Sequence, residues 1–235
     1  MQLSLALDAD PRLPRIRDRL VALYGPQRDP WRLEPTLQFV CAMLSSCTKD
    51  EISTDAFIRL LAALPSLQSL PDSDLHAITL LIARVEHAAN KARDLIRAAR
   101  IIRTKHGRFD LAFLAGWPVA DAFSWLDRIP GVGVKIAGAT LNFSTLRQPV
   151  LVVDRHMLYS SKCLGLLPHT ADFARGFRML MHLIPNNWDA DDLYELHWLM
   201  KKHSQTACSH PRIACDECPL AALCGMRRLK SAIAH

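Results

Sequence analysis

Four of the seven cysteines of this chain lie in one short C-terminal segment. They are Cys208, Cys215, Cys218 and Cys224, separated by gaps of six, two and five residues. Short gaps allow four thiolates to close around one metal centre, either zinc or an iron–sulfur cluster. Structural zinc sites usually pair two Cys-x-x-Cys motifs, and this segment has one such motif, so the spacing favours iron and sulfur.

A second group of residues suited to chemistry lies mid-chain, in Ile129-Pro130-Gly131-Val132-Gly133. Gly131 and Gly133 permit a tight turn and a close backbone approach. The helix expected after them begins with amide groups that lack intrahelical partners, and a phosphate suits that position. Such contacts would hold DNA without reading its sequence. Taken alone, an ordinary turn between two helices remains open.

Three motifs, in order, resemble the endonuclease III and adenine glycosylase families. The cysteine spacing is similar to their [4Fe–4S] loop with no gap changed, and residues 129–137 resemble their helix–hairpin–helix motif. Residues 151–156, Leu-Val-Val-Asp-Arg-His, resemble their Val-Asp-Thr-His segment. The resemblance runs from about Pro35 to Cys224. It implies a structural [4Fe–4S] cluster held by the four cysteines, and DNA contacts from Gly131, Val132 and Gly133.

The same resemblance implies catalytic roles for Lys135 and Asp154. A damaged base must leave the helical stack before its glycosidic carbon can be reached. A lysine amine can then attack the sugar C1′ and form a Schiff base, which eliminates the 3′ phosphate. The amine must be unprotonated, and burial or nearby positive charge can lower a lysine pKa from about 10.4.

Asp154 would stabilise the positive charge that develops at C1′. In the family, the lysine separates enzymes that also cut the strand from those that only remove a base. Simpler interpretations remain open for each residue alone: a surface lysine for Lys135, a helix cap for Asp154, and a structural hydrogen bond for His156.

Two positions differ from the family pattern in the segments that, in the family, extrude the flipped base and fill the gap it leaves. Residues 44–50 resemble Leu-Ser-Ser-Gln-Thr-Lys-Asp, but Cys47 replaces the glutamine that enters the gap left by the base. In the expected register, His87 replaces an apolar wedge before Lys91. Cys47, His87 and Lys91 are still expected to contact DNA. Because the residues that open the stack have changed, cleavage at abasic sites should persist better than removal of intact damaged bases.

The resemblance therefore predicts a bifunctional DNA glycosylase and abasic-site lyase for oxidised pyrimidines. Its expected partner is double-stranded DNA with oxidised-base or abasic lesions, bound by a monomer. Two alternatives stay open: a monofunctional glycosylase, and a non-catalytic module that binds damaged DNA.

Helices must position these residues. Apolar residues at helical spacing predict helices over 15–23, 34–45, 56–64, 91–105, 120–128 and 134–142. Asp50, Ser53 and Thr54 are expected to cap the third of these. The only β-branched run, 150–153, is too short to found a sheet. The predicted fold is all-α.

The resemblance implies two helical lobes. One spans 28–147 and contains the hairpin, and the other joins 1–27 to 148–235 and contains the cluster. The DNA-binding groove is expected between them. Before the resemblance is considered, the cysteines outside the C-terminal group, Cys41, Cys47 and Cys163, are interpreted as small buried side chains.

The charge of the chain agrees with a polyanionic partner. Its formal net charge is +6 and its pI is near 9.1, and basic residues set against phosphates release counterions. No stretch approaches the roughly 20 apolar residues that a membrane span needs. The N-terminus has no apolar run long enough for a signal peptide, so a bacterial or archaeal cytoplasm, close to the nucleoid, is expected.

Overall fold

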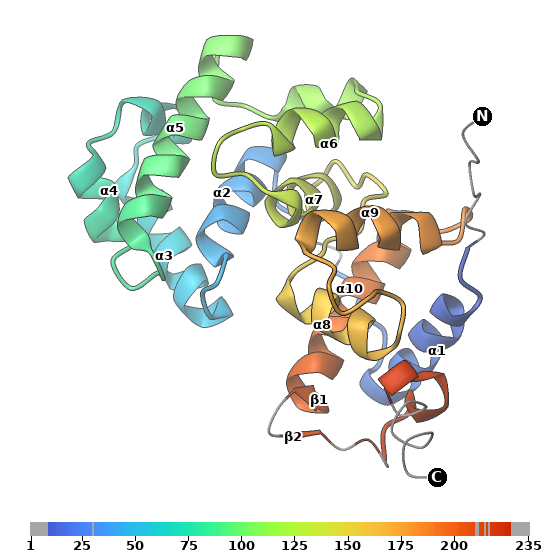
Figure 1. Cartoon of the computed structure of the whole chain (residues 1–235). Coiled ribbons are helices and arrows are strands. Elements are labelled where there is room, and N and C mark those ends of the chain that lie inside the picture. The colour runs from blue at the N-terminus through green and yellow to red at the C-terminus, as the bar shows by residue number, and fades with distance from the viewer. Residues whose placement is uncertain (1–8, 30, 210–211, 214, 216, 227–235) are drawn as a thin grey trace. The chain divides into compact units, whose positions relative to one another are not determined.

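The computed structural model describes residues 9–29, 31–209, 212–213, 215 and 217–226. Contacts divide the chain into two units, Met1–Pro30 with Pro149–His235, and Trp31–Gln148. Figure 1 traces the helices of both. The prediction of an all-α fold is confirmed: within the described residues, the strands are limited to the two-residue pair β1 (Cys208–Ser209) and β2 (Arg212–Ile213).

The unit of residues 31–148 is made of helices alone, apart from an isolated bridge between Leu33 and Ser144. Its elements are α2 (Pro35–Ser45), α3 (Asp50–Ala63), η1 (Leu67–Asp72), α4 (Leu75–Leu81), α5 (Ala88–His106), η2 (Ala112–Gly116), α6 (Val119–Asp127) and α7 (Val134–Asn142).

Helices α2 and α7 pack against each other in the core of this unit. Phe39, Val40 and Leu44 of α2 are fully buried, and so are Ala137 and Leu141 of α7. Full burial of a Val, Leu or Phe side chain stabilises a fold by roughly 1.5–3 kcal/mol. The packing fixes the C-terminal end of α2 next to the first turn of α7, where Lys135 lies.

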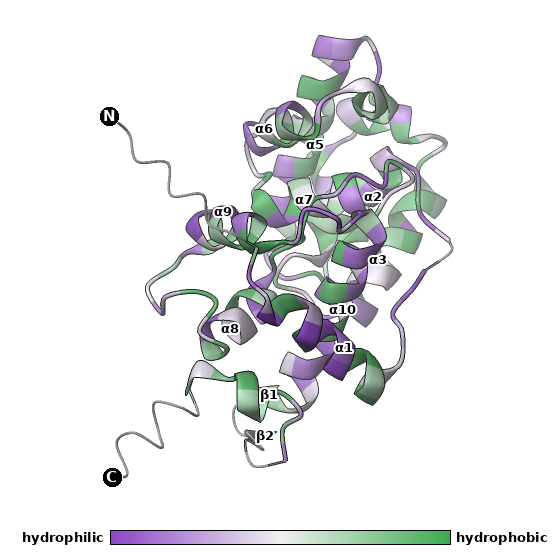
Figure 2. Ribbon diagram, turned by 90° about the vertical axis from the view of Figure 1, so that its right-hand side faces the viewer, coloured by the Kyte–Doolittle hydropathy of each residue, from purple (hydrophilic) through white to green (hydrophobic). Residues whose placement is uncertain are grey.

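The unit of residues 1–30 and 149–235 holds the remaining elements. These are α1 (Arg12–Tyr24), α8 (Arg155–Cys163), α9 (Phe173–Leu183), α10 (Ala190–Thr206), β1, β2 and η3 (Ala221–Leu223). Most of these helices carry both hydrophilic and hydrophobic residues, as Figure 2 shows, and bury the hydrophobic ones. Leu20 of α1, Leu180 of α9 and Leu196 of α10 are fully buried in one cluster.

Helix α10 has the best-defined start in this unit. The side chain of Asp189 accepts hydrogen bonds from the backbone of Asp191 and Asp192, and Asp192 accepts one in return from the Asp189 backbone. This reciprocal capping box satisfies N–H groups that have no intrahelical acceptor. The buried extended segment 150–153 leads directly into α8.

Several helix predictions hold closely and one detail is wrong. Helix α7 has the expected bounds, 134–142, while α5 begins three residues earlier than expected. Helix α3 begins at Asp50 after the N-cap Lys49. Asp50, Ser53 and Thr54 therefore lie inside the helix instead of capping it, and the Ser53 hydroxyl donates back to the Asp50 carbonyl at 3.0 Å.

None of the described helices combines the length and apolar character that a membrane-spanning helix needs. Residues 1–8, on which the expected absence of a signal peptide partly rests, lie outside the described residues.

Candidate functional site

Only one of the two glycines in the turn between α6 and α7 occupies a position that requires glycine. Gly131 has a φ of 85°, and a Cβ placed on it would lie 2.7 Å from the Cβ of Asp94 in α5. Gly133 has a negative φ, and nothing lies within 4 Å of a Cβ placed there. Gly131 is thus needed for the turn itself, whereas Gly133 leaves open space in front of the first turn of α7.

Lys135 lies in that first turn, and its side chain is half-buried. Its amine donates a hydrogen bond to the hydroxyl of Ser45, the last residue of α2, at 2.7 Å. Ser45 in turn donates to the carbonyl of Ala42 at 3.1 Å. The amine is therefore held against the end of α2, which is unlike an ordinary surface lysine.

Lys91 of α5 reaches the same end of α2. Its amine donates to the carbonyl of Leu44 at 2.7 Å, to the carbonyl of Ser46, and to the hydroxyl of Thr48 at 3.1 Å. The pKa of Lys91 is lowered to about 8, first by burial and then by the charge of Lys135. The contact of Lys91 with DNA stays a prediction.

Cys47 and His87 share an uncommon backbone conformation. Their φ angles are 55° and 59°, in the left-handed region that side-chain-bearing residues seldom adopt. Both are exposed. The expectation that Cys47 is a buried side chain is wrong, because it lies in the turn that follows the end of α2 rather than on the buried face of the helix. Cys41 is partly buried, and Cys163 is buried as expected.

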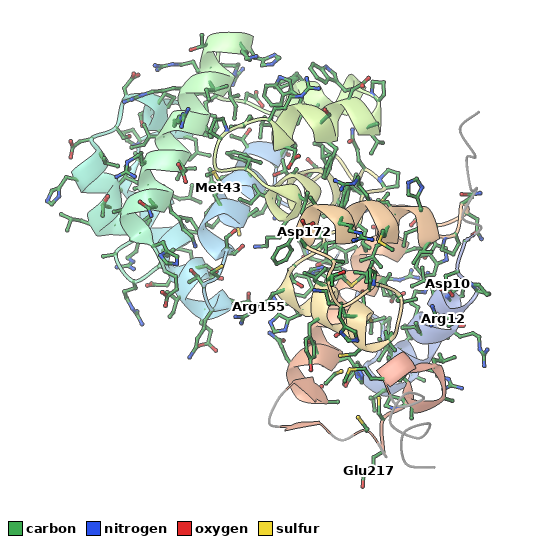
Figure 3. The ribbon with its side chains drawn as sticks, viewed as in Figure 1. Asp10, Arg12, Met43, Arg155, Asp172 and Glu217 are labelled. Carbon is green, nitrogen blue, oxygen red and sulfur yellow. The ribbon has the colours of Figure 1, made fainter. Side chains whose placement is uncertain are left out.

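Asp154 is the N-cap of α8. Its carboxylate accepts a hydrogen bond from the backbone N–H of Met157 at 2.8 Å, so the simpler interpretation as a helix cap holds. Burial acts to raise the pKa of Asp154, but His197, the Met157 amide, His156 and Lys201 outweigh it and the pKa is lowered. The carboxylate is consequently ionised at neutral pH and available to stabilise a positive charge. Arg155 follows it as the exposed first residue of α8, labelled in Figure 3.

Helix α10 supplies two buried residues near Asp154 that sequence reasoning missed. His197 is 3% exposed and its Nδ1 lies 2.8 Å from the carbonyl of Val152, while Lys201, one turn further, is 9% exposed. The charged and polar residues recurring on one face of 190–206 could have signalled this. His156, whose Nδ1 lies 3.1 Å from the Ser204 hydroxyl, has the structural hydrogen bond that was the alternative to catalysis.

All four C-terminal cysteines line one pocket, although no metal geometry is formed. Leu164, Ala207, Leu220 and Ala221 are among the other residues that line it. Among the residues that the structure describes, no three His, Cys, Asp or Glu side chains lie close enough together to hold a metal ion. The thiols thus surround one space without converging on a point.

Two contacts attach this segment to the end of α8. The Cys224 thiol donates to the carbonyl of Cys163 at 3.2 Å, and the backbone N–H of Gly225 donates to the carbonyl of Leu164 at 3.3 Å. Cys163 also lines the pocket, and so does His203, whose Nε2 lies 3.6 Å from the Cys218 sulfur. Neither was predicted there, because only the tertiary packing of α8 and α10 brings them to the loop.

Comparison with proteins of known sequence finds endonuclease III relatives. The chain is 27% identical over 201 residues to the endonuclease III homolog of Encephalitozoon cuniculi, covering 79% of this chain and 76% of that protein. It is 24% identical over 177 residues to endonuclease III-like protein 1 of Gallus gallus, covering 75% and 58%. No family model matches the chain.

The solved structures agree. A trapped endonuclease III–DNA covalent intermediate aligns with a TM-score of 0.75 at 19% identity, covering 94% of this chain and 97% of that one. The chain is thus similar in sequence to proteins named endonuclease III and shares the fold of an endonuclease III–DNA complex. A thermostable thymine-DNA glycosylase also shares the fold, with a TM-score of 0.71 at 14% identity over 92% of this chain and 95% of that one.

The chain is shorter than some of these relatives. It spans 62% of the length of a relative from Arabidopsis thaliana and 58% of the Gallus gallus protein.

The two hairpin glycines give a testable contrast in stability. Gly131→Ala should lower the free energy of unfolding by about 2 kcal/mol or more, because it combines a left-handed alanine with the overlap on Asp94. Gly133→Ala should stay within about 1 kcal/mol of the original chain, since its Cβ meets no atom. Urea denaturation measures both, and equal losses would contradict the geometry.

Proposed function

We propose that this protein is a base-excision DNA glycosylase with abasic-site lyase activity, acting through Lys135. The observation that carries the proposal is the position of the Lys135 amine, 2.7 Å from the Ser45 hydroxyl and directly behind the glycine turn. The relatives named endonuclease III, and the fold shared with an endonuclease III–DNA complex, support a DNA substrate.

Backbone binding is assigned to the hairpin. The N-terminal turn of α7 directs amide groups and the positive end of its dipole outward, and the open space at Gly133 admits a phosphate oxygen close to the backbone. Gly131, Val132 and Gly133 would therefore fix the register of the protein on a strand without reading its bases. The net charge of +6 adds a general attraction to DNA.

The reaction uses the lone pair of Lys135. The neutral amine attacks C1′ of the damaged nucleotide, and the base leaves with the electron pair of the glycosidic bond and takes up a proton. The resulting aminal opens to an iminium ion. Loss of a proton from C2′ then expels the 3′ phosphate and cuts the strand.

Asp154 is assigned the stabilisation of charge at C1′. Its lowered pKa keeps the carboxylate ionised at neutral pH, and its hydrogen bond with Met157 fixes its orientation. A fixed anion stabilises a developing cation without having to reorganise. The cap role and the catalytic role are compatible, since a carboxylate has two oxygens and the Met157 amide contacts Oδ1.

The substrate range follows from Cys47 and His87. Both are exposed residues held in the left-handed conformation, so each projects from a fixed backbone. A cysteine is short and hydrogen-bonds poorly, so it is a weak substitute for a base that has left the stack. An abasic site has no base to extrude, and we assign the protein a preference for abasic sites over intact oxidised pyrimidines.

The first prediction from this proposal compares two duplexes in single-turnover reactions. Strand cleavage should be at least tenfold faster at an abasic site than at thymine glycol, because only the second requires base extrusion. Comparable rates would contradict the substrate assignment, and base release without strand cleavage would indicate a monofunctional glycosylase.

The lysine role has a matched control. Lys135→Ala should abolish cleavage of both duplexes while retaining DNA affinity, since the hairpin backbone is unchanged. Lys105→Ala, at an exposed position in the last turn of α5, should cleave like the original chain. Full cleavage by Lys135→Ala in an excess of duplex would rule the proposal out.

The cysteine pocket fits a [4Fe–4S] cluster. Four thiols line one space whose other walls are largely apolar, and four thiolates are the donor set such a cluster uses. Cys208, Cys215, Cys218 and Cys224 would hold it. When bound, the cluster would cross-link the four positions of the segment 208–224 to one another, with every ligand position taken by protein.

Metal analysis tests this assignment. The purified protein should contain about four irons and four inorganic sulfides per chain, with broad visible absorbance. Cys218→Ala should lose them, whereas Cys41→Ala, outside the pocket, should retain them. One zinc per chain in place of iron and sulfide would overturn the cluster assignment.

A further inference from the structure

The cysteine pocket holds one thiol more than a [4Fe–4S] cluster binds. Cys163, the last residue of α8, is buried and lines the same pocket as the four C-terminal cysteines. A cluster with one cysteine on each iron uses four thiolates. Because the spacing of the sequence assigns those four positions to the segment 208–224, the proposed function leaves the fifth sulfur without a role.

The Cys163 thiol contacts one of the four assigned ligands directly. It is hydrogen-bonded to the thiol of Cys208 and to the hydroxyl of Tyr159, one turn earlier in α8. Two sulfur ligands on one tetrahedral metal, with bonds of about 2.3 Å, lie roughly 3.8 Å apart. Hydrogen-bonded thiols lie at a similar separation. An iron atom bound to Cys208 is therefore within reach of the Cys163 sulfur after a small movement of the loop.

The packing of the C-terminal segment on the end of α8 fixes the position of Cys163. The Cys224 thiol donates to the carbonyl of Cys163 at 3.2 Å. The backbone N–H of Gly225 donates to the carbonyl of Leu164 at 3.3 Å. A Cβ placed on Gly225 would lie 3.2 Å from the Cα of Gly165, so the two backbones are in close contact. Cys163 is thereby held beside the last cysteine of the segment, while its thiol contacts the first.

His203 also lines the pocket and has a side chain that binds metals. Its Nε2 lies 3.6 Å from the sulfur of Cys218. The imidazole is therefore paired with Cys218, whereas the Cys163 thiol is paired with Cys208. This arrangement makes Cys163 the candidate to replace Cys208 in particular.

We propose that Cys163 is a reserve ligand of the cluster that takes the place of Cys208. In this exchange the Cys163 sulfur binds the iron that the Cys208 sulfur leaves, and the proton of the Cys163 thiol ends on Cys208. One iron–sulfur bond forms and one breaks, and no electron is transferred. Without Cys208, Cys163 completes the ligand set with Cys215, Cys218 and Cys224. The inference rests on the proposed [4Fe–4S] assignment and is independent of the lyase reaction.

Iron and sulfide analysis of alanine variants tests the exchange. Cys208→Ala should keep about four irons and four inorganic sulfides per chain, because Cys163 supplies the missing thiolate. Cys208→Ala combined with Cys163→Ala should fall to about three irons per chain or fewer, because one iron then has no protein ligand. Electron paramagnetic resonance of the oxidised protein is a second readout, since a three-iron cluster gives a signal that a four-iron cluster in its usual state lacks.

Two control variants separate a lost ligand from a general loss of stability. Cys163→Ala alone retains Cys208 and should keep the full iron content, which also shows that truncating Cys163 does not prevent folding. Cys208→Ala combined with Cys41→Ala, a cysteine of α2 outside the pocket, should match Cys208→Ala. If circular dichroism shows that Cys163→Ala does not fold, Cys163→Val replaces it in both the single and the double variant.

Two results would overturn the reserve-ligand role while leaving the cluster assignment intact. One is a loss of iron in Cys208→Ala when the original chain holds its full content. The other is a double variant of Cys208 and Cys163 that keeps as much iron as Cys208→Ala alone. An original chain without iron would contradict the cluster assignment itself, and this inference with it, so the two failures are distinguishable.

Discussion

The carbonyl groups at the C-terminal end of α2 lack hydrogen-bond donors within the helix. The candidate site within residues 31–148 depends on the side chains that donate to them. Lys91 from α5 donates to the carbonyls of Leu44 and Ser46, and Lys135 from α7 donates to the Ser45 hydroxyl between them. Structural hydrogen bonding thus brings two like charges close together. Such a pair costs stability, and the charge of Lys135 adds to burial in lowering the pKa of Lys91.

In the other unit, Asp154 combines an observed structural role with the chemical role proposed for it. Its carboxylate begins α8 through the Met157 amide, and His197 and Lys201 of α10 contribute to its lowered pKa. A capping aspartate is ordinarily exchangeable with asparagine or serine. Neither of those residues would supply the negative charge that the proposed role of Asp154 at C1′ requires.

Local signals were enough to predict part of this arrangement. The glycine turn and its apolar flanks predicted α7, with Lys135 in its first turn. The surroundings of these residues were not predictable, because they come from distant segments: Lys91 meets Leu44 across 47 residues and His197 meets Val152 across 45. The prediction that Cys47 is buried was wrong, because the hydrophobicity of cysteine does not indicate backbone conformation. Cys47 is exposed in a turn where its φ angle is positive.

The central claim is that Lys135, and not the neighbouring Lys91, forms the covalent bond to the sugar. Tryptic mapping of a borohydride-reduced adduct on an abasic duplex tests it directly. The account predicts the sugar remnant on the peptide of residues 129–147, which contains Lys135 as its only internal lysine. A remnant on residues 85–93, which contain Lys91, would contradict it.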